Sequence, residues 1–251
     1  MNPVHPALRR FHAARALALV AAVVVTTLAT PVSYAGVFSV VPVRIYMTPR
    51  DRAVAITVTN EGDTEMVLQA EINTWRQKPD GSDEQVASED LILSPPILKL
   101  PPRGRQVVRL ARVGAPDQSQ QLTYRLIMRE VPEVGAAKDR IQIPVALALS
   151  MPVFITPAGA KREMKCEAAR GTGSVVEVFC ANAGNAYAQV RGVQVQKGSD
   201  VLGKLDGGFY VLPGARKTLT VTTQQPVPSG STQLTVTFDD GKTESFDVVI
   251  P

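Results

Sequence analysis

The amino-acid sequence predicts an all-β protein of two immunoglobulin-like β-sandwich domains that follow a cleaved signal peptide. Three observations predict this fold class. Almost every segment after residue 35 alternates apolar and polar residues with a period of two, which is typical of half-buried strands. Turn residues separate these segments, and no segment has the periodicity of an amphipathic helix. About 216 of the 251 residues remain after residue 35, enough for two domains of about 100 residues each.

The first 35 residues have the three parts of a secretory signal peptide. Three arginines precede the apolar run ALALVAAVVV, and the small residues Ser33 and Ala35 precede the expected cleavage site. The apolar run is too short to span a membrane comfortably, and no later run reaches about 20 apolar residues. We therefore expect residues 1–35 to be removed and the remainder to be exported in soluble form, without membrane insertion.

The composition argues against an enzyme. Both histidines, His5 and His12, lie in the signal peptide, so the mature chain lacks the commonest general base and the commonest metal ligand. We find no serine-hydrolase elbow, phosphate loop, dinucleotide motif or paired-carboxylate arrangement. DGSDE at residues 80–84 lacks the ligand spacing of a calcium loop and is expected to be a solvated hairpin turn. We expect no catalytic residue, no metal site and no cofactor.

Period-two segments bounded by turn residues predict seven strands in the first domain. Their ranges are 37–47, 53–60, 66–77, 91–96, 105–113, 123–131 and 141–155. Turns such as NEGD and KPDG separate them, and seven short strands of this kind are typical of an immunoglobulin-like sandwich. Trp75 falls on the third strand, where that fold buries its core tryptophan. We therefore expect Trp75 to pack in the core rather than to stack on a ligand.

The seventh predicted strand, in RIQIPVALALSMPVFITP (residues 140–157), has an unusually long apolar ridge. Every odd position from Ile141 to Ile155 is a large apolar residue. The pattern is longer than the usual strand of about 5 to 6 residues. One interpretation is that the ridge faces the core of its own domain, which is the default for aliphatic side chains. The other is that part of the ridge binds a second protein.

TPAGA at residues 156–160 is a short linker, so we expect the first domain to span residues 36–156 and the second residues 157–251. The period-two pattern resumes in REMKCEAAR, SVVEVFCANAG and AQVRGVQVQKG, followed by a turn-rich GGFYVLPGARKTLTV. A final hairpin, QLTVTFDDGKTESFDVVI, has its turn at Asp240-Gly241. The second half is thus predicted to be a smaller β-sandwich.

The two cysteines, Cys166 and Cys180, are expected to form a disulfide in an exported protein. Their midpoint is Gly173, in the turn-rich ARGTGS, so a hairpin folded there places the cysteines opposite each other. A redox role is the rival interpretation, but the sequence has no CxxC motif.

Several stretches, in the same order along nearly the whole mature chain, resemble the periplasmic chaperones of the chaperone-usher pathway of pilus assembly. They are SVVPVRIYM, TVTNEGD, NTWRQ, SPPILKLPPRGRQVVRL, TYRLIMREVP, SMPVF and GGFYVLPGARKTL. The likeness is closest to the non-classical (archaic) branch. It implies two immunoglobulin-like domains in a boomerang arrangement, located in the periplasm, with pilus subunits and an outer-membrane usher as partners. The implied mechanism is donor-strand complementation, in which a chaperone strand fills the apolar groove of an incomplete subunit.

The resemblance assigns the subunit-binding strand to the apolar ridge. By position relative to the linker, the family's exposed hydrophobic motif matches Ile143, Val145 and Leu147, and Ile141 and Leu149 extend it. Pro144 removes one N–H from this strand, so backbone pairing must be interrupted or offset there.

Chaperones of the classical branch anchor the C-terminal carboxylate of the subunit with a lysine near the end of this strand and an arginine on the first strand. Arg44 matches the arginine, but Pro152 stands at the lysine position. A register estimate places Arg125 opposite roughly residues 146–149, close to the missing lysine. We therefore predict that Arg44 and Arg125 bind the carboxylate, with Arg109 as a weaker third candidate. A surface ion pair is the alternative role for each arginine.

Two other functions are weighed against the chaperone. An exported adhesin or carbohydrate-binding module needs exposed aromatic platforms, and only 5% of the residues are aromatic. An enzyme on a β-sandwich scaffold is disfavoured by the missing histidines. Three of the 27 basic residues lie in the signal peptide and 23 residues are acidic, so the mature chain is nearly neutral and a nucleic-acid partner is not expected. Self-association of the free protein through its apolar ridge is a further expectation.

Overall fold

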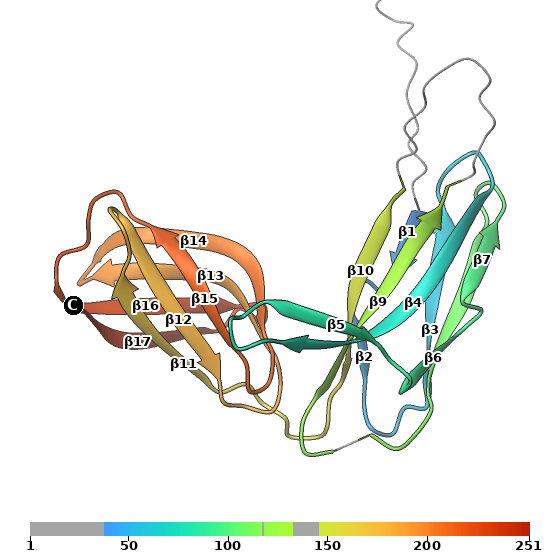
Figure 1. Cartoon of the computed structure of the whole chain (residues 1–251), viewed down its shortest axis with the longest axis horizontal. Helices are drawn as coiled ribbons and strands as arrows, with labels where there is room; N and C mark the ends of the chain where they lie inside the picture. The colour runs from blue at the N-terminus through green and yellow to red at the C-terminus, as the bar shows by residue number, and fades with distance from the viewer. Residues whose placement is uncertain (1–37, 117, 133–145) are drawn as a thin grey trace, which may run out of the picture. The chain divides into compact units, whose positions relative to one another are not determined.

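The computed structural model describes residues 38–116, 118–132 and 146–251. Every regular element in this part of the chain is a β-strand, which confirms the predicted all-β class. Within the same ranges, no helix has the length and apolar character needed to cross a membrane. Residues 38–251 form one compact unit, and Figure 1 shows its strands in two groups. The predicted signal peptide, residues 1–35, lies outside the described residues.

The first group of strands forms a sandwich of two sheets (Figure 1). The strand bounds are Phe38–Val41 (β1), Ile45–Met47 (β2), Ala53–Asn60 (β3), Met66–Gln77 (β4), Asp83–Ala87 (β5), Leu91–Ser94 (β6), Ile97–Leu100 (β7), Arg105–Arg112 (β8), Leu122–Val131 (β9) and Ala148–Ile155 (β10). One sheet has the order β1-β3-β8-β6, and the other has the order β2-β10-β9-β4-β5, with β7 also paired to β4. Side chains from both sheets, such as Ile56 and Leu126, meet in one apolar core.

The segment predicted as a single strand, residues 37–47, is divided between the two sheets. β1 pairs antiparallel with β3, whereas β2 pairs parallel with β10. Pro42 stands between them, and its missing N–H prevents the first ladder from continuing. The chain therefore changes sheets here, which brings Arg44, directly before β2, to the side of β10.

The sequence pattern predicts seven strands in this sandwich, but the described residues contain ten. Besides the division of the first strand, the pattern misses β5, which is short, mostly polar and exposed and so has no apolar alternation. It also misses β7, because the two prolines before it, Pro95 and Pro96, are unfavourable in strands and the pattern therefore indicates no new strand after β6. The bounds of β3 and β4 are those predicted.

DGSDE at residues 80–84 forms the predicted turn, which connects β4 to β5. Asp80 Oδ1 accepts hydrogen bonds from the Ser82 backbone N and from Ser82 Oγ. Gly81 has a φ of +82°, a left-handed conformation that glycine adopts without strain.

Trp75 is buried, as predicted, but it does not lie in the core of the first sandwich. On β4, the even-numbered residues from Met66 to Ile72 face that core, and Trp75 points to the opposite side. It packs with Phe154 and Leu212 in a separate cluster. The prediction of an immunoglobulin-type core tryptophan is therefore wrong, because the alternation of the strand directs this side chain toward the second sandwich.

The second group of strands forms a smaller sandwich. The bounds are Met164–Arg170 (β11), Val175–Asn182 (β12), Ala188–Lys197 (β13), Asp200–Val211 (β14), Arg216–Thr222 (β15), Gly230–Phe238 (β16) and Thr243–Ile250 (β17). A sheet of order β11-β12-β15 packs against a sheet of order β14-β13-β16-β17. The GGFYV part of the predicted turn-rich segment belongs to strand β14. The last hairpin turns at Asp240-Gly241, as predicted, with Gly241 at a φ of +78°.

Cys166 and Cys180 form the predicted disulfide. They are register partners in the β11–β12 hairpin, and Gly173 has a φ of +67° in its turn. Both cysteines belong to the buried core of the second sandwich. This position supports a structural role for the bond rather than a redox role.

Candidate functional site

Two arginines flank Pro152 within the sheet of the first sandwich that contains β10. On one side, Arg125 of β9 is the register partner of Pro152. On the other side, Val153 pairs with Ile45 of β2, so the same register continued by one residue places Arg44 beside Pro152. The two arginines therefore lie in one row across the sheet, on the strands that neighbour β10.

The register estimate from the sequence gives the wrong partner residues for Arg125, although it places Arg125 in the correct region of the sheet. It puts Arg125 opposite residues 146–149, whereas the partner is Pro152. The β9–β10 register is symmetric about residues 138–139, a few residues later than the turn pattern indicates. The correction moves Arg125 directly opposite the position at which the family resemblance expects a lysine.

Arg125 is a half-buried cation that lies over aromatic rings. Its Cζ is 3.7 Å from the centroid of the Trp75 ring and 5.6 Å from that of Tyr210, within the range of cation–π attraction. Its Nε is buried and has no hydrogen-bond partner among the described residues. Burial lowers the pKa of Arg125, while electrostatic interactions with Asp83 and Tyr210 act in the opposite direction.

The charge of Arg125 has no direct counter-ion in the described part of the chain, where the ion pairs involve other residues. A partly desolvated cation without a paired anion is costly. A carboxylate that reached this guanidinium would offset that cost with charge-assisted hydrogen bonds. The Arg125 guanidinium therefore has N–H donors that a carboxylate can accept from.

Arg44 has a carboxylate partner within the chain. Its Nη1 donates a hydrogen bond of 2.9 Å to Oδ2 of Asp239. The Tyr187 hydroxyl donates to the same oxygen over 3.4 Å and lies 2.9 Å from the Tyr46 hydroxyl. Burial acts to lower the pKa of Arg44, but the hydrogen bond with Tyr46 and electrostatic interactions with Tyr210, Tyr46 and Asp239 raise it above its ordinary value.

Five aromatic side chains contributed by both sandwiches lie around these arginines. They are Tyr46, Trp75, Phe154, Tyr187 and Tyr210. Phe154 is fully buried and stacks on Tyr187, with ring centroids 4.1 Å apart, and on Tyr46, at 5.7 Å. Because Phe154 belongs to β10, this stacking holds that strand against the second sandwich.

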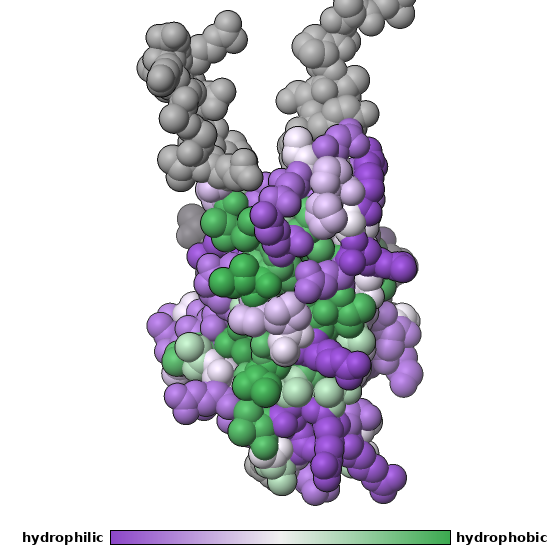
Figure 2. All heavy atoms as spheres, turned by 90° about the vertical axis from the view of Figure 1, so that its right-hand side faces the viewer, coloured by the Kyte–Doolittle hydropathy of each residue, from purple (hydrophilic) through white to green (hydrophobic). Residues whose placement is uncertain are grey.

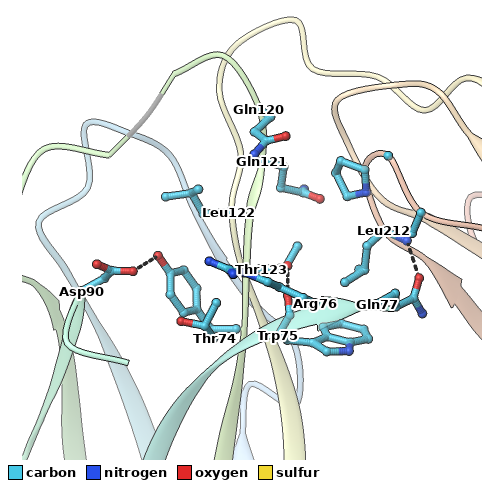
Figure 3. Close-up of a pocket in the computed structure, with 14 residues that line it drawn as sticks. Thr74, Trp75, Arg76, Gln77, Asp90, Gln120, Gln121, Leu122, Thr123 and Leu212 are labelled. Carbon is cyan, nitrogen blue, oxygen red and sulfur yellow. Dashed lines mark hydrogen bonds between the residues drawn. The ribbon is translucent and has the colours of Figure 1, made fainter. Parts of the chain in front are cut away.

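Two glutamines join the sandwiches through backbone hydrogen bonds, and sequence reasoning misses both. Gln77 Nε2 donates to Tyr210 O over 2.8 Å. Gln77 Oε1 accepts from Leu212 N over 2.9 Å, as Figure 3 shows. Gln121 Oε1 accepts from Tyr187 N over 2.8 Å. A glutamine at a strand end gives no local signal of such a role, because its partners lie far away in the sequence.

A pocket of about 330 Å³ lies beside the aromatic cluster and is lined by residues of both sandwiches. Figure 3 shows Gln77 hydrogen-bonded to Leu212 at one side of it and Thr123 hydrogen-bonded to the backbone of Trp75. Neither Arg44 nor Arg125 lines this pocket. It is therefore distinct from the place where the two arginines flank Pro152.

β10 has an open edge over its first residues. It pairs with β9 along its whole length, Ala148–Ile155, but with β2 only over residues 153–155. Among the described residues, no second strand covers the other edge of residues 148–152. An open edge presents unpaired backbone donors and acceptors to an added strand.

The described residues of the apolar ridge in the predicted seventh strand lie in two different environments, one buried and one exposed. Ile141, Ile143 and Val145, together with Pro144, lie outside the described residues. Further along, Met151, Val153 and Ile155 are buried in the core of their own sandwich, and Leu149 packs partly buried against that core. Leu147, directly before β10, is 39% exposed. The interpretation that the ridge faces its own core therefore holds from Leu149 onward, and the ridge is accessible at Leu147.

Arg109 is separated from the other two arginines. It lies on β8 in the opposite sheet, pairs with Ala55 and has an exposed side chain. The structure thus brings Arg44 and Arg125 to one strand and places the third candidate elsewhere.

Apolar residues are also exposed away from the aromatic cluster. Figure 2 shows them interspersed with hydrophilic residues on one face of the molecule. Exposed examples in the first sandwich are Val41, Ile92, Ile97 and Val107. Scattered apolar residues of this kind are usual on protein surfaces, so they do not by themselves indicate a site.

Comparisons with known proteins point to one family. Residues 37–161, about half of the chain, match the model of the PapD N-terminal domain of the pili and flagellar-assembly chaperones. A search of curated proteins finds no match.

Three solved structures illustrate the structural likeness. The CsuC–CsuE chaperone–tip adhesion subunit complex of archaic Csu pili from Acinetobacter baumannii contains a chain with 19% identity and a TM-score of 0.64, over 86% of this chain and 99% of that one. The E. coli chaperone DraB has 17% identity and a TM-score of 0.57, over 86% and 97%. The Pseudomonas aeruginosa CupB2 chaperone has 20% identity and a TM-score of 0.52, over 83% and 97%. At these identities the likeness establishes the fold.

Proposed function

Because this chain belongs to the family of pili and flagellar-assembly chaperones, we propose that it is a periplasmic chaperone that binds pilus subunits by donor-strand complementation. It caps the apolar groove of an incomplete subunit and delivers the subunit to an outer-membrane usher. Residues 1–35 are removed on export, residues 36–156 form the subunit-binding domain, and residues 157–251 form the second domain. The protein acts by binding alone, without catalysis and without a cofactor.

The open edge of β10 is the observation that carries this proposal. Glu130 N on β9 donates a hydrogen bond to Leu147 O, so the backbone carbonyl of Leu147 points toward β9. Because residues alternate along an antiparallel ladder, the backbone groups of Ala148 and Ser150 point to the uncovered edge. A subunit strand added there gains main-chain hydrogen bonds, while alternate side chains of the chaperone enter its groove.

The side chains that enter the groove are those at the start of the ridge. Leu147 is exposed and available for this role. Ile141, Ile143 and Val145 are proposed on the family resemblance alone, and Leu149 contributes only the part of its surface that its own core leaves free. Each fully buried aliphatic side chain contributes about 1.5 to 3 kcal/mol, so a few such anchors outweigh the cost of association.

The C-terminal carboxylate of the subunit binds between Arg44 and Arg125. Arg125 supplies a guanidinium that is fixed over Trp75 and has no ion pair among the described residues. Arg44 supplies a second guanidinium on the other side of Pro152. Planar guanidinium groups pair with carboxylates through two parallel hydrogen bonds, so two arginines replace the missing lysine.

An adhesin or carbohydrate-binding module is less well supported. A sugar-binding site needs exposed aromatic faces, whereas Trp75 and Phe154 are almost fully buried. Their rings are used within the cluster between the sandwiches.

The test is periplasmic co-expression with candidate pilin subunits, followed by co-purification. We expect Leu147→Arg to reduce subunit recovery at least tenfold, about 1.4 kcal/mol, because a charge cannot enter an apolar groove without cost. Val249→Arg is the matched control, since Val249 is 71% exposed on β17 in the second sandwich. Equal recovery of the subunit with Leu147→Arg and with the unmodified chain would refute strand donation at this position.

A further inference from the structure

Arg44 and Asp239 form an ion pair between the two sandwiches. Arg44 directly precedes β2, and Asp239 directly follows β16. Arg44 Nη1 lies 2.9 Å from Asp239 Oδ2, and the two side chains are 33% and 19% exposed. The Tyr187 hydroxyl donates to the same oxygen. A guanidinium assigned to an incoming carboxylate is therefore occupied by a carboxylate of the chain itself.

Asp239 and a chain terminus offer Arg44 the same chemistry, a planar anion with two acceptor oxygens. Ion pairs that remain partly exposed contribute little net stability, because water competes for both charges. Exchange of one carboxylate for another at Arg44 is therefore nearly balanced in free energy. The backbone of Asp239 is held to the neighbouring strand β13, because its N donates to Gln189 O over 3.1 Å, so Asp239 is not free to follow Arg44 toward a new partner.

We propose that Asp239 is an internal competitor that holds Arg44 in the free chaperone and is displaced by the C-terminal carboxylate of a bound subunit. This inference rests on the proposed function, because it requires Arg44 to bind that carboxylate. Arg125, which has no ion pair in the described ranges, receives the carboxylate first, and Arg44 follows when it leaves Asp239. Displacement thereby breaks one contact between the sandwiches, and Asp239 limits the affinity for subunits.

Asp240 provides a matched control in the same turn. It pairs with Arg162 over 3.0 Å and with Lys242 over 3.7 Å, rather than with Arg44. Asp240→Asn removes one negative charge from the same hairpin without releasing Arg44. Any effect that Asp239→Asn has beyond that of Asp240→Asn is therefore specific to the pairing with Arg44.

The experiment uses the mature chain and a short labelled peptide of alternating valine and serine residues, made once with a free C-terminal carboxylate and once as the C-terminal amide. Binding is measured by fluorescence anisotropy. We expect Asp239→Asn to bind the free-acid peptide about fivefold more tightly than the unmodified chain does, equivalent to about 1 kcal/mol, the upper end for a partly exposed ion pair. Its affinity for the amide should be unchanged, and Asp240→Asn should match the unmodified chain with both peptides.

A second measurement uses the unmodified protein and so does not depend on a variant. The ¹³Cγ resonance of Asp239 should shift when the free-acid peptide is added and stay in place with the amide.

The outcomes separate the inference from the function on which it rests. If the unmodified chain binds the free-acid and the amide peptide equally, the proposal that Arg44 and Arg125 bind a carboxylate is wrong. The proposed role of Asp239 as a competitor is then wrong as well. If it prefers the acid but Asp239→Asn gives no gain, or the Asp239 resonance does not move, only the competitor is wrong.

Discussion

Arg125 on β9 is the register partner of Pro152 on β10. This pairing puts a guanidinium beside the one position at which the family resemblance leads us to expect a lysine and the sequence has none. The Trp75 ring below the guanidinium fixes its plane, so the cation is oriented before any partner arrives. Such preorganisation lowers the cost of binding a carboxylate.

Removal of either arginine of the proposed carboxylate anchor should reduce subunit capture. We expect Arg44→Ala and Arg125→Ala each to lower the amount of co-purified subunit about tenfold or more, because a charge-assisted hydrogen bond contributes about 1.5 to 3 kcal/mol. Arg109→Ala is the matched control, since Arg109 is exposed on the opposite sheet. Unchanged capture by both of the first two variants would contradict the anchor, and a loss with Arg109→Ala would restore that residue as a candidate.

Phe154 should be one of the residues on which stability depends most. Phe154→Ala removes a fully buried ring that stacks on Tyr187 and Tyr46, and we expect it to lower the free energy of unfolding by about 3 to 5 kcal/mol. Urea unfolding measures this change. Phe179→Ala, at a position that is 40% exposed, should cost far less. Similar losses for the two variants would show that the cluster does not contribute as the packing indicates.

Gln77 should hold the end of β14 against the first sandwich. Gln77→Ala leaves Leu212 N and Tyr210 O without the partners they have in the native structure, and we expect a cost of about 1 to 3 kcal/mol. Hydrogen exchange at the Leu212 amide should become faster. Gln85→Ala, at an exposed position on β5, serves as the control and should leave that exchange rate unchanged. The same protection of Leu212 in both variants would argue against the role of Gln77.

Loss of the Cys166–Cys180 disulfide should destabilise the second sandwich. The bond closes the β11–β12 hairpin, and we expect the double variant Cys166→Ala, Cys180→Ala to lose about 2 to 5 kcal/mol, because the unfolded chain is no longer constrained. Melting temperatures with and without a reductant measure the effect. The reductant should lower the melting temperature of the unmodified chain and leave that of the double variant unchanged.

Subunit binding should depend little on pH between about 6 and 9. The mature chain has no histidine, since His5 and His12 lie in the expected signal peptide. Burial raises the pKa of Tyr187 and of Tyr210, so these hydroxyls stay protonated to higher pH than usual. A steep change in affinity within this window, measured by anisotropy in matched buffers, would indicate a titrating group that the described residues do not reveal.

Acidic pH should lower the free energy of unfolding, because carboxylates that form ion pairs in the folded protein become protonated. Hydrogen bonding to Arg162 holds the pKa of Asp240 below its ordinary value. Its contribution to stability is therefore present above the ordinary aspartate pKa of about 4 and is lost as the pH falls through the lower folded value. Urea unfolding at a series of acidic pH values should show this loss, and Asp240→Asn should reduce it.

Local sequence patterns predict the strands well where each strand is half-buried. β3 and β4 have the predicted bounds, because alternate apolar residues in them face one core. The hairpin turns at Gly173 and Gly241 follow from local turn chemistry, and the disulfide follows from its symmetric spacing about the first of them. β5 is missed because an exposed edge strand needs no apolar face.

The candidate site was predictable only in part. The family resemblance and the register estimate point to Arg44 and Arg125, but they do not predict which residues surround these two side chains. The ion pair of Arg44 with Asp239 joins residues that are 195 positions apart, and the contact of Arg125 with Trp75 depends on which face of β4 that ring occupies. No local pattern contains either contact.

Local patterns are enough to predict the all-β class, the division into two sandwiches and most of the strands, because period-two burial and turn preferences act over a few neighbouring residues. Three features of the site follow only from the folded arrangement: Trp75 lies outside the core of its own sandwich, Asp239 pairs with Arg44, and Arg125 lies opposite Pro152. These arrangements depend on the register of one strand against another and on the packing of one sandwich against the next. Both are set by the sum of many distant contacts, which no short stretch of sequence encodes.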